Sequence, residues 1–114
     1  MESNLKQPLQ CLLLSEGLID SAMNGEKTIT IREGHRDYKI GKVVLACPDV
    51  YWSMITVIES VRHTTFNEVT ELEYAEDGFV SRTDLFEGLK VYYPDLELCS
   101  PVTIIKLKPT WEEQ

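Results

Sequence analysis

The sequence predicts an α+β fold, a small β-barrel with a mostly antiparallel, curved sheet and two or three short helices. Its β-branched runs are separated by short helical patterns, without the regular alternation of strands and helices that builds a parallel sheet. The run from Trp52 to His63 is long for a strand, and strands of this length are typical of sheets that curve toward a barrel. Because 114 residues are enough for one core, residues 1–114 are predicted to form a single domain.

The first predicted elements are a strand and a short helix. Residues 1–8 are polar, so a loose terminus is expected, and the apolar run 9–14 predicts a buried strand. Ser15 is a good N-cap for the helix, and Gly25 is expected to end it in the left-handed conformation. The expected apolar face of this helix consists of Leu18, Ile19, Ala22 and Met23.

A strand over residues 27–32 follows that helix at once. Side chains alternate between the two faces of a strand, so the isoleucines of this run are expected to face the core. Lys27 lies at the junction, where its amine is free to turn toward either face. A polar loop over residues 33–40 comes next and is expected to be mobile and beside the site. The opposite, solvated face of the strand is expected to carry Thr28, Thr30 and Arg32.

The second half of the chain supplies the remaining strands and helices. Residues 42–47 predict a central strand, and residues 102–107 predict a closing strand before a loose tail over residues 109–114. Two segments, 65–68 and 81–84, have the form of a capping box. They predict one helix that reaches about residue 73 and a second helix that a following proline ends.

Composition excludes several classes of protein. No apolar run approaches the roughly 20 residues of a membrane span, and the N-terminus lacks the basic residues of a signal peptide, so a cytoplasmic location is predicted. The cysteines Cys11, Cys47 and Cys99 are far apart and odd in number, which argues against a disulfide framework or a metal knuckle. Buried thiols are expected, with no metal and no cofactor.

The charge distribution limits the partners. The net charge is -8, which argues against binding duplex DNA through a long phosphate backbone. Residues 27–42 nevertheless hold five basic and two acidic side chains, a local charge of +3. A basic patch on an acidic body suits a small nucleoside or a short single-stranded RNA, and no membrane partner is expected. The oligomeric state is left open, with a monomer as the expectation.

One motif is specific. The run Gly25-Glu26-Lys27-Thr28-Ile29-Thr30-Ile31-Arg32 resembles the signature of the ASCH domain, a small β-barrel family related in fold to PUA RNA-binding domains. Within that family the chain looks most like the small bacterial N4-acetylcytidine amidohydrolases. The resemblance extends through the turn at 77–79 and the helix end at 92–94 to the last strand. It implies a PUA-like ASCH barrel and hydrolysis of the N4-acyl amide of a cytosine nucleoside, a linear amide C–N bond.

The resemblance also implies roles for two motif residues. In these amidohydrolases the motif lysine acts as general base and the second motif threonine as nucleophile, which implies Lys27 and Thr30 here. A threonine hydroxyl is a weak nucleophile until a base takes its proton, and a lysine is a base only when it is neutral. Desolvation and the neighbouring Arg32 would favour the neutral amine.

The proton donor is where this chain departs from the family pattern. The relatives carry a glutamate shortly before the second helix. Alignment on Gly78-Phe79 places Asp77 at that position, whereas alignment on Ala75 places Gly78 there and leaves Glu76 as a neighbour. We prefer Asp77, although its side chain reaches about one bond less far and a proton donor must come within about 3 Å of the leaving group.

The remaining expectations concern binding. Arg32 suits a phosphate or the carbonyl edge of a base, and a structural ion pair with Glu33 or Asp77 is the alternative. Two other functions stay open: a non-catalytic module that binds RNA or a modified base, and an RNA-cleaving ASCH enzyme. The aspartate favours the binding module, whereas the acidic net charge favours a small ligand. The expected substrate-binding residues are Thr28, Arg32, Glu76 and His35.

Overall fold

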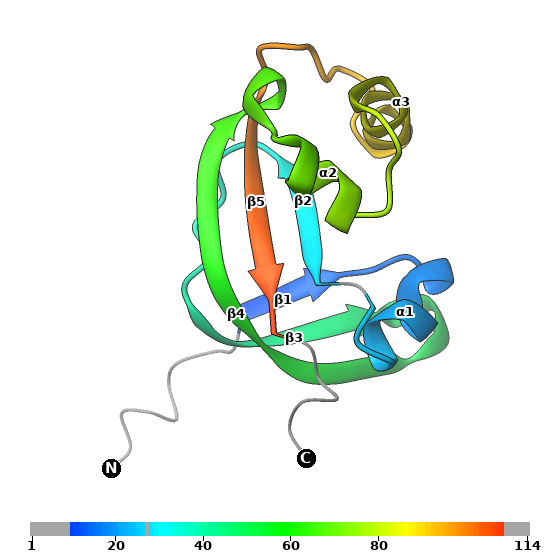
Figure 1. Cartoon of the computed structure of the whole chain (residues 1–114). Coiled ribbons are helices and arrows are strands. Elements are labelled where there is room, and N and C mark those ends of the chain that lie inside the picture. The colour runs from blue at the N-terminus through cyan, green and yellow to red at the C-terminus, as the bar shows by residue number, and fades with distance from the viewer. Residues whose placement is uncertain (1–9, 27, 109–114) are drawn as a thin grey trace.

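Five strands form one curled sheet in the computed structural model, which describes residues 10–26 and 28–108 (Figure 1). The strand order is β1-β3-β4-β5-β2; β1 pairs with β3 in parallel, and the other neighbouring strands pair antiparallel. The predicted α+β class and mostly antiparallel sheet are therefore confirmed. Residues 1–8 and 109–114, expected to be loose, and Lys27 lie outside the described residues. The elements are β1 (Gln10–Leu13), α1 (Ile19–Met23), β2 (Ile29–Glu33), β3 (Gly41–Cys47), β4 (Trp52–Thr65), α2 (Glu71–Glu76), α3 (Arg82–Tyr92) and β5 (Pro101–Leu107).

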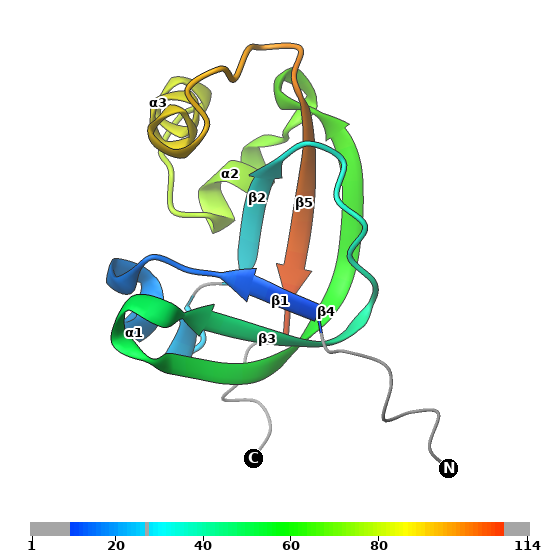
Figure 2. The same cartoon turned by 180° about the vertical axis from the view of Figure 1, so that it is seen from behind.

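The long strand β4 curves and serves both halves of the sheet (Figures 1 and 2). Its first half pairs with β3 and its second half with β5, with a bulge between Ile58 and Ser60. A bulge increases the local twist of a sheet. The curl brings the two edge strands near each other, since Arg32 on β2 donates a hydrogen bond to the backbone oxygen of Leu13 on β1 at 2.9 Å. This opening between the sheet edges is where the candidate site lies.

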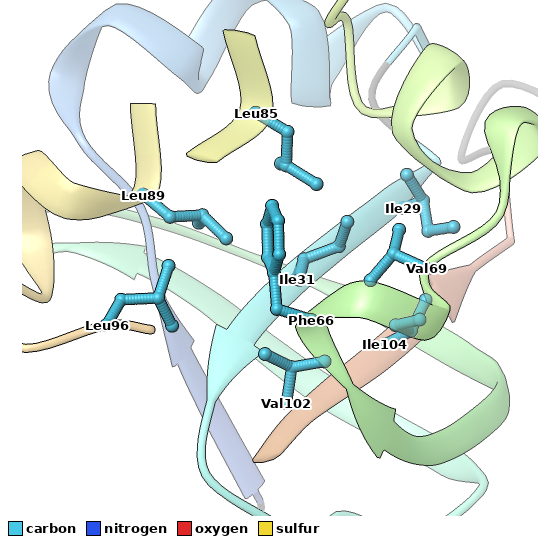
Figure 3. Packing of buried hydrophobic residues seen from close by; sticks show 9 residues of the cluster. All are labelled: Ile29, Ile31, Phe66, Val69, Leu85, Leu89, Leu96, Val102 and Ile104. Carbon is cyan, nitrogen blue, oxygen red and sulfur yellow. The ribbon is translucent and has the colours of Figure 1, made fainter. Parts of the chain in front are cut away.

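Two apolar clusters fill the two sides of the curled sheet. The first lies between β2, β5 and the helices α2 and α3, as Figure 3 shows, and the expected core-facing isoleucines of β2 belong to it. The second lies around β1, β3 and the end of β5. Strand β5 contributes to both clusters because Val102 and Ile104 face one and Ile105 and Leu107 face the other. A strand buried on both faces is expected to read as a nearly continuous apolar run, as this one does.

The first predicted capping box was placed too early. Thr65 precedes only the 3₁₀ turn Phe66–Glu68 and makes no side-chain cap. The chain then becomes extended at the buried Val69, and Thr70 forms the capping box of α2 with Glu73. Thr70 Oγ1 accepts from the Glu73 backbone N–H at 3.2 Å, and the Thr70 N–H donates to Glu73 Oε1 at 2.9 Å.

The second predicted capping box is confirmed in its Ser81 half, while the Asp84 carboxylate accepts from the Val80 N–H at 3.3 Å. Ser81 Oγ accepts from the backbone N–H of Asp84 at 3.0 Å, and α3 ends at Tyr92, shortly before Pro94. Burial of Leu85 and Leu89 fixes α3 against the first cluster.

Several expectations of burial were wrong. Strand β1 is an edge strand in which Leu12 is buried while Leu13 is 57% exposed, because alternate side chains of an edge strand point away from the core. Cys11 is exposed for the same reason, and Cys99 is exposed in the loop before β5, whereas Cys47 is buried as expected. In the first helix Ala22 is buried, but Leu18 and Met23 are exposed and Ile19 is half-buried.

Candidate functional site

A cavity of about 600 Å³ lies where β2 faces the end of β1 and the helix α3. This volume is typical of sites for small organic ligands. Its aromatic wall is formed by Phe79, Tyr92 and Tyr93. Its polar lining consists of Ser15, Thr30, Arg32, Arg36, Asp49 and Asp77.

The entry into β2 is set by the end of the preceding helix. Gly25 has a φ of 80°, as predicted for a left-handed helix end. Its N–H donates to Ala22 O at 3.4 Å, and the Glu26 N–H donates to Ser21 O at 2.9 Å. These two bonds form a Schellman motif, which turns the chain sharply toward β2. Lys27 follows this turn, and its own position lies outside the described residues.

Thr30 and Arg32 share the cavity face of β2. Arg32 Nε donates to Thr30 Oγ1 at 3.0 Å, and Arg32 Nη2 donates to Leu13 O at 2.9 Å. The sequence placed Thr30 on a solvated face, which was wrong: Thr30 is 4% exposed, because the curl of the sheet brings the end of β1 to this face, where Arg32 contacts Leu13. Since arginine only donates hydrogen bonds, the hydroxyl hydrogen of Thr30 stays available for an acceptor.

Asp77 reaches the cavity from the end of α2. It is the C-cap of this helix, which closes with a second Schellman motif: Phe79 N–H donates to Tyr74 O at 2.9 Å and Gly78 N–H to Ala75 O at 3.0 Å. Gly78 has a φ of 94°, the left-handed conformation that glycine adopts without strain. Thr30, Arg32 and Asp77 therefore line one cavity, although Asp77 is distant from the other two in sequence.

The helix α2 is held to β4 by an ion pair. Arg62 donates through Nε and Nη2 to the two carboxylate oxygens of Glu73, at 2.9 and 3.0 Å. Burial alone would raise the pKa of Glu73, but the hydrogen bonds from Arg62 and Thr70 outweigh it, so the pKa is lowered. The same pairing raises the pKa of Arg62. This contact fixes the helix whose end carries Asp77.

Three of the predicted binding residues are not among the described residues that line the cavity. Thr28 is half-buried, and its backbone oxygen accepts from the Leu107 N–H at 2.7 Å. Glu76 forms an ion pair with Lys106, with 3.6 Å between Glu76 Oε2 and Lys106 Nζ. His35 stacks on His63 with ring centroids 4.9 Å apart, and its Nε2 lies 3.0 Å from the backbone oxygen of Thr64.

Hydrogen bonds from β5 hold part of the polar loop over residues 33–40, for which the sequence predicted mobility. The buried Thr103 Oγ1 donates to Gly34 O at 2.6 Å and accepts from the Arg36 N–H at 2.7 Å. Arg36 lies at the cavity, whereas the sequence indicated this residue only as part of a basic patch. The only sequence feature that pointed to Arg36 was the positive charge of the patch. Its position could not be predicted locally, because Thr103, which holds it, belongs to the distant strand β5.

The aromatic wall was also missed, because Tyr92 and Tyr93 were interpreted only as the end of a helix. Tyr92 Oη lies 3.0 Å from Ser15 Oγ, which links α3 to the segment after β1. Phe79 packs closely on Gly88, where an added Cβ would lie 2.8 Å from Phe79 Cε1. A larger residue at position 88 would displace this ring, so the glycine keeps the wall of the cavity in place.

Within residues 10–26 and 28–108, no three histidine, cysteine, aspartate or glutamate side chains come together as a metal site. No helix in the described part of the chain is long and apolar enough to cross a membrane.

Comparison with known proteins shows the fold. No family model matches the sequence, and no curated protein matches it. Among solved structures, the ASCH protein of Zymomonas mobilis matches with a TM-score of 0.62 and 15% identity over 86% of this chain. Two variants of that protein, one with tyrosine replaced by phenylalanine and one with serine replaced by alanine, give TM-scores of 0.63 and 0.64 at 15% and 14% identity, again over 86% of this chain. The chain spans about two thirds of their length, 65 to 67%. It therefore has the fold of an ASCH domain, as the Gly25 to Arg32 motif implied.

Proposed function

We propose that this chain is an ASCH-family hydrolase that removes the acyl group from N4-acetylcytidine, with Thr30 as nucleophile. The observation that carries the proposal is that Thr30, Arg32 and Asp77 line the same cavity. Two of these residues belong to the motif that resembles the ASCH signature, and the fold is that of an ASCH protein.

The cavity has the properties of a nucleoside site. Its volume of about 600 Å³ leaves room for a base and a sugar. Phe79, Tyr92 and Tyr93 line the cavity, and aromatic side chains are groups on which nucleic-acid bases commonly stack. Arg32 has donors left beyond its hydrogen bonds to Thr30 and Leu13 for the carbonyl edge of the base.

The proposed first step forms an acyl-threonine. Thr30 Oγ1 attacks the acyl carbon while the neutral amine of Lys27 takes the hydroxyl proton. The bond between the acyl carbon and N4 breaks, and the acid form of Asp77 gives a proton to the leaving nitrogen. Arg32 acts as a positioning residue, because its Nε holds Thr30 Oγ1 and leaves the hydroxyl hydrogen directed elsewhere.

The second step returns the enzyme to its starting state. The Asp77 carboxylate takes a proton from water, and the resulting hydroxide attacks the acyl-threonine ester. The threonine oxygen leaves with the proton that Lys27 holds, and acetic acid is released. The overall reaction consumes one water molecule and gives cytidine and acetic acid. Thr30, Lys27 and Asp77 regain their initial protonation.

A non-catalytic binding module is the second candidate. The aspartate at position 77, in place of the glutamate of the relatives, favours it, because the shorter side chain brings its carboxyl less far toward a leaving nitrogen. Arg32 and the aromatic rings would serve binding in either case.

One experiment separates the two candidates. The purified protein is incubated with N4-acetylcytidine, released cytidine is measured by chromatography, and binding is measured in parallel by calorimetry. The proposed hydrolase releases cytidine at a rate proportional to protein concentration. Binding without release would favour the binding module, and neither binding nor release would overturn both candidates.

A further inference from the structure

Arg36 is fixed at the cavity by four separate contacts. Its backbone N–H donates to Thr103 Oγ1 at 2.7 Å, and its backbone oxygen lies 2.8 Å from His63 Nε2. Its side chain is held through Nε, which donates to Glu33 O at 2.7 Å. The guanidinium carbon lies 5.8 Å from the centre of the Tyr93 ring, within the range of a cation–π contact. A long side chain on a loop is thus ordered before any ligand arrives.

The outer nitrogens of this guanidinium have no partner in the described part of the chain. No acceptor within residues 10–26 and 28–108 binds Nη1 or Nη2 of Arg36, and no carboxylate there forms an ion pair with it. Arg62 differs, since its Nη2 binds both Glu73 and the backbone oxygen of Glu68. Arg36 lines the cavity, so its two outer nitrogens present four N–H donors to a ligand or to solvent.

We propose that Arg36 binds a phosphate group carried by the nucleoside ligand, so that the preferred ligand is a nucleotide rather than a free nucleoside. This inference rests on the nucleoside cavity of the proposed function and names its substrate class. Two parallel N–H groups of a guanidinium match two oxygens of a phosphate, and such charge-assisted bonds are the strongest hydrogen bonds that proteins make. The guanidinium pays little entropy on binding, because Glu33 O and Tyr93 already hold it.

The position of the phosphate follows from the other charged side chains that line the cavity. Asp49 also lines the cavity and would repel an anion, whereas Arg32 would attract it. Arg32 uses Nε and Nη2 to bind Thr30 and Leu13 and lies beside the proposed reacting atom, so its remaining donors are assigned to the base. The base is therefore assigned to the side of Thr30 and Arg32, and the phosphate to Arg36.

The test compares three ligands by isothermal titration: cytidine, cytidine 5′-monophosphate and the dinucleoside phosphate of two cytidines. The wild-type protein is expected to bind a phosphate-bearing ligand at least about 10-fold more tightly than cytidine, the scale of a charge-assisted hydrogen bond. A larger gain for the monophosphate identifies a free nucleotide as the ligand, and a larger gain for the dinucleoside phosphate identifies a short single strand. Equal binding of all three, or no binding of any, overturns the proposal.

Variants tie the gain to Arg36. Arg36→Gln should remove the advantage of the phosphate while leaving cytidine affinity within about 3-fold, and Arg36→Lys should keep part of it, since an ammonium retains charge but not the paired donors. Lys39→Gln is the matched control, because Lys39 is a cation of the same loop that pairs with Asp37 and is not among the described lining residues. Thermal unfolding of each variant confirms that it folds.

An undiminished phosphate advantage in Arg36→Gln would overturn the assignment. These measurements need no turnover, so an absence of amide hydrolysis would refute the proposed reaction without deciding this binding site.

Discussion

Arg32 joins the two open edges of the sheet, since its Nη2 on β2 donates to the backbone oxygen of Leu13 on β1 at 2.9 Å. The same guanidinium holds the proposed nucleophile, Thr30 Oγ1, through Nε at 3.0 Å. One side chain therefore links the two sheet edges and contacts the proposed nucleophile. The hydrogen bond also satisfies a carbonyl group at the edge of β1, where an unpaired group would otherwise invite another strand.

Arg32→Lys should weaken both functions of this residue. An ammonium keeps the charge but has no planar pair of donors with which to reach Thr30 and Leu13 together. We expect a loss of about 1–3 kcal/mol in the free energy of unfolding, the scale of a hydrogen bond to a charged group, together with slower hydrolysis. Urea unfolding and initial rates measure these effects. Lys42→Arg, an exposed change of the opposite sense on β3, is the control. Wild-type stability and rate in Arg32→Lys would contradict this role.

Lys27 is assigned as the base, and two substitutions separate its chemistry from its charge. Lys27→Ala should lower kcat by about 100-fold or more, the usual effect of removing a general base. Lys27→Arg should be as slow, because arginine keeps the positive charge but does not give up its proton. Stopped assays of cytidine release give both rates. A nearly normal rate for Lys27→Arg would show that positive charge, rather than a base, is what the site requires.

Asp77 is assigned as the proton donor, and the length of its side chain is part of that assignment. Asp77→Asn should lower kcat by about 100-fold, because an amide has no acidic proton to give. Asp77→Glu restores the residue of the relatives and should retain activity or raise it. Glu76→Gln is the adjacent control, since Glu76 pairs with Lys106 and is not among the described lining residues. If Glu76→Gln is the variant that loses activity, the assignment of Asp77 as proton donor is refuted.

The Arg62–Glu73 pair should make stability depend on pH. The pKa of Glu73 is lowered from its usual value of 4.5, so the carboxylate stabilises the folded state above that pH. This stabilisation is lost as the pH falls from 4.5 through the lower folded value. The destabilisation caused by Glu73→Gln, measured by urea unfolding, should therefore shrink from about pH 7 to about pH 3. Glu71→Gln, exposed on the same helix, is the control, and a pH-independent difference for Glu73→Gln would refute the argument.

Local pattern was sufficient for most of the fold. The β-branched runs predicted β2, β3, β4 and β5 close to their observed bounds, because alternation and turn residues are properties of neighbouring positions. Residues 70–73 also have the form of a capping box, which the prediction at Thr65 overlooked. Burial of Val69 between them decides in favour of Thr70, and burial is a property of the folded chain.

The site was only partly predictable for the same reason. The motif and the aligned turn pointed to Thr30, Arg32 and Asp77, which line one cavity. The burial of Thr30 depends on the curl of the sheet, and the place of Arg36 depends on Thr103 of β5. Neither relationship is local in sequence, so periodicity and spacing gave no signal for them.

The most direct test of the account is the rate of N4-acetylcytidine hydrolysis by Thr30→Ser and Thr30→Ala beside the wild type. Thr30→Ser keeps the hydroxyl that Arg32 Nε holds and should retain measurable cytidine release. Thr30→Ala removes the nucleophile and should abolish release, while the lost hydrogen bond costs about 1 kcal/mol of unfolding free energy and leaves the protein folded. Cytidine release by folded Thr30→Ala at the wild-type rate would contradict the assignment of Thr30 as nucleophile.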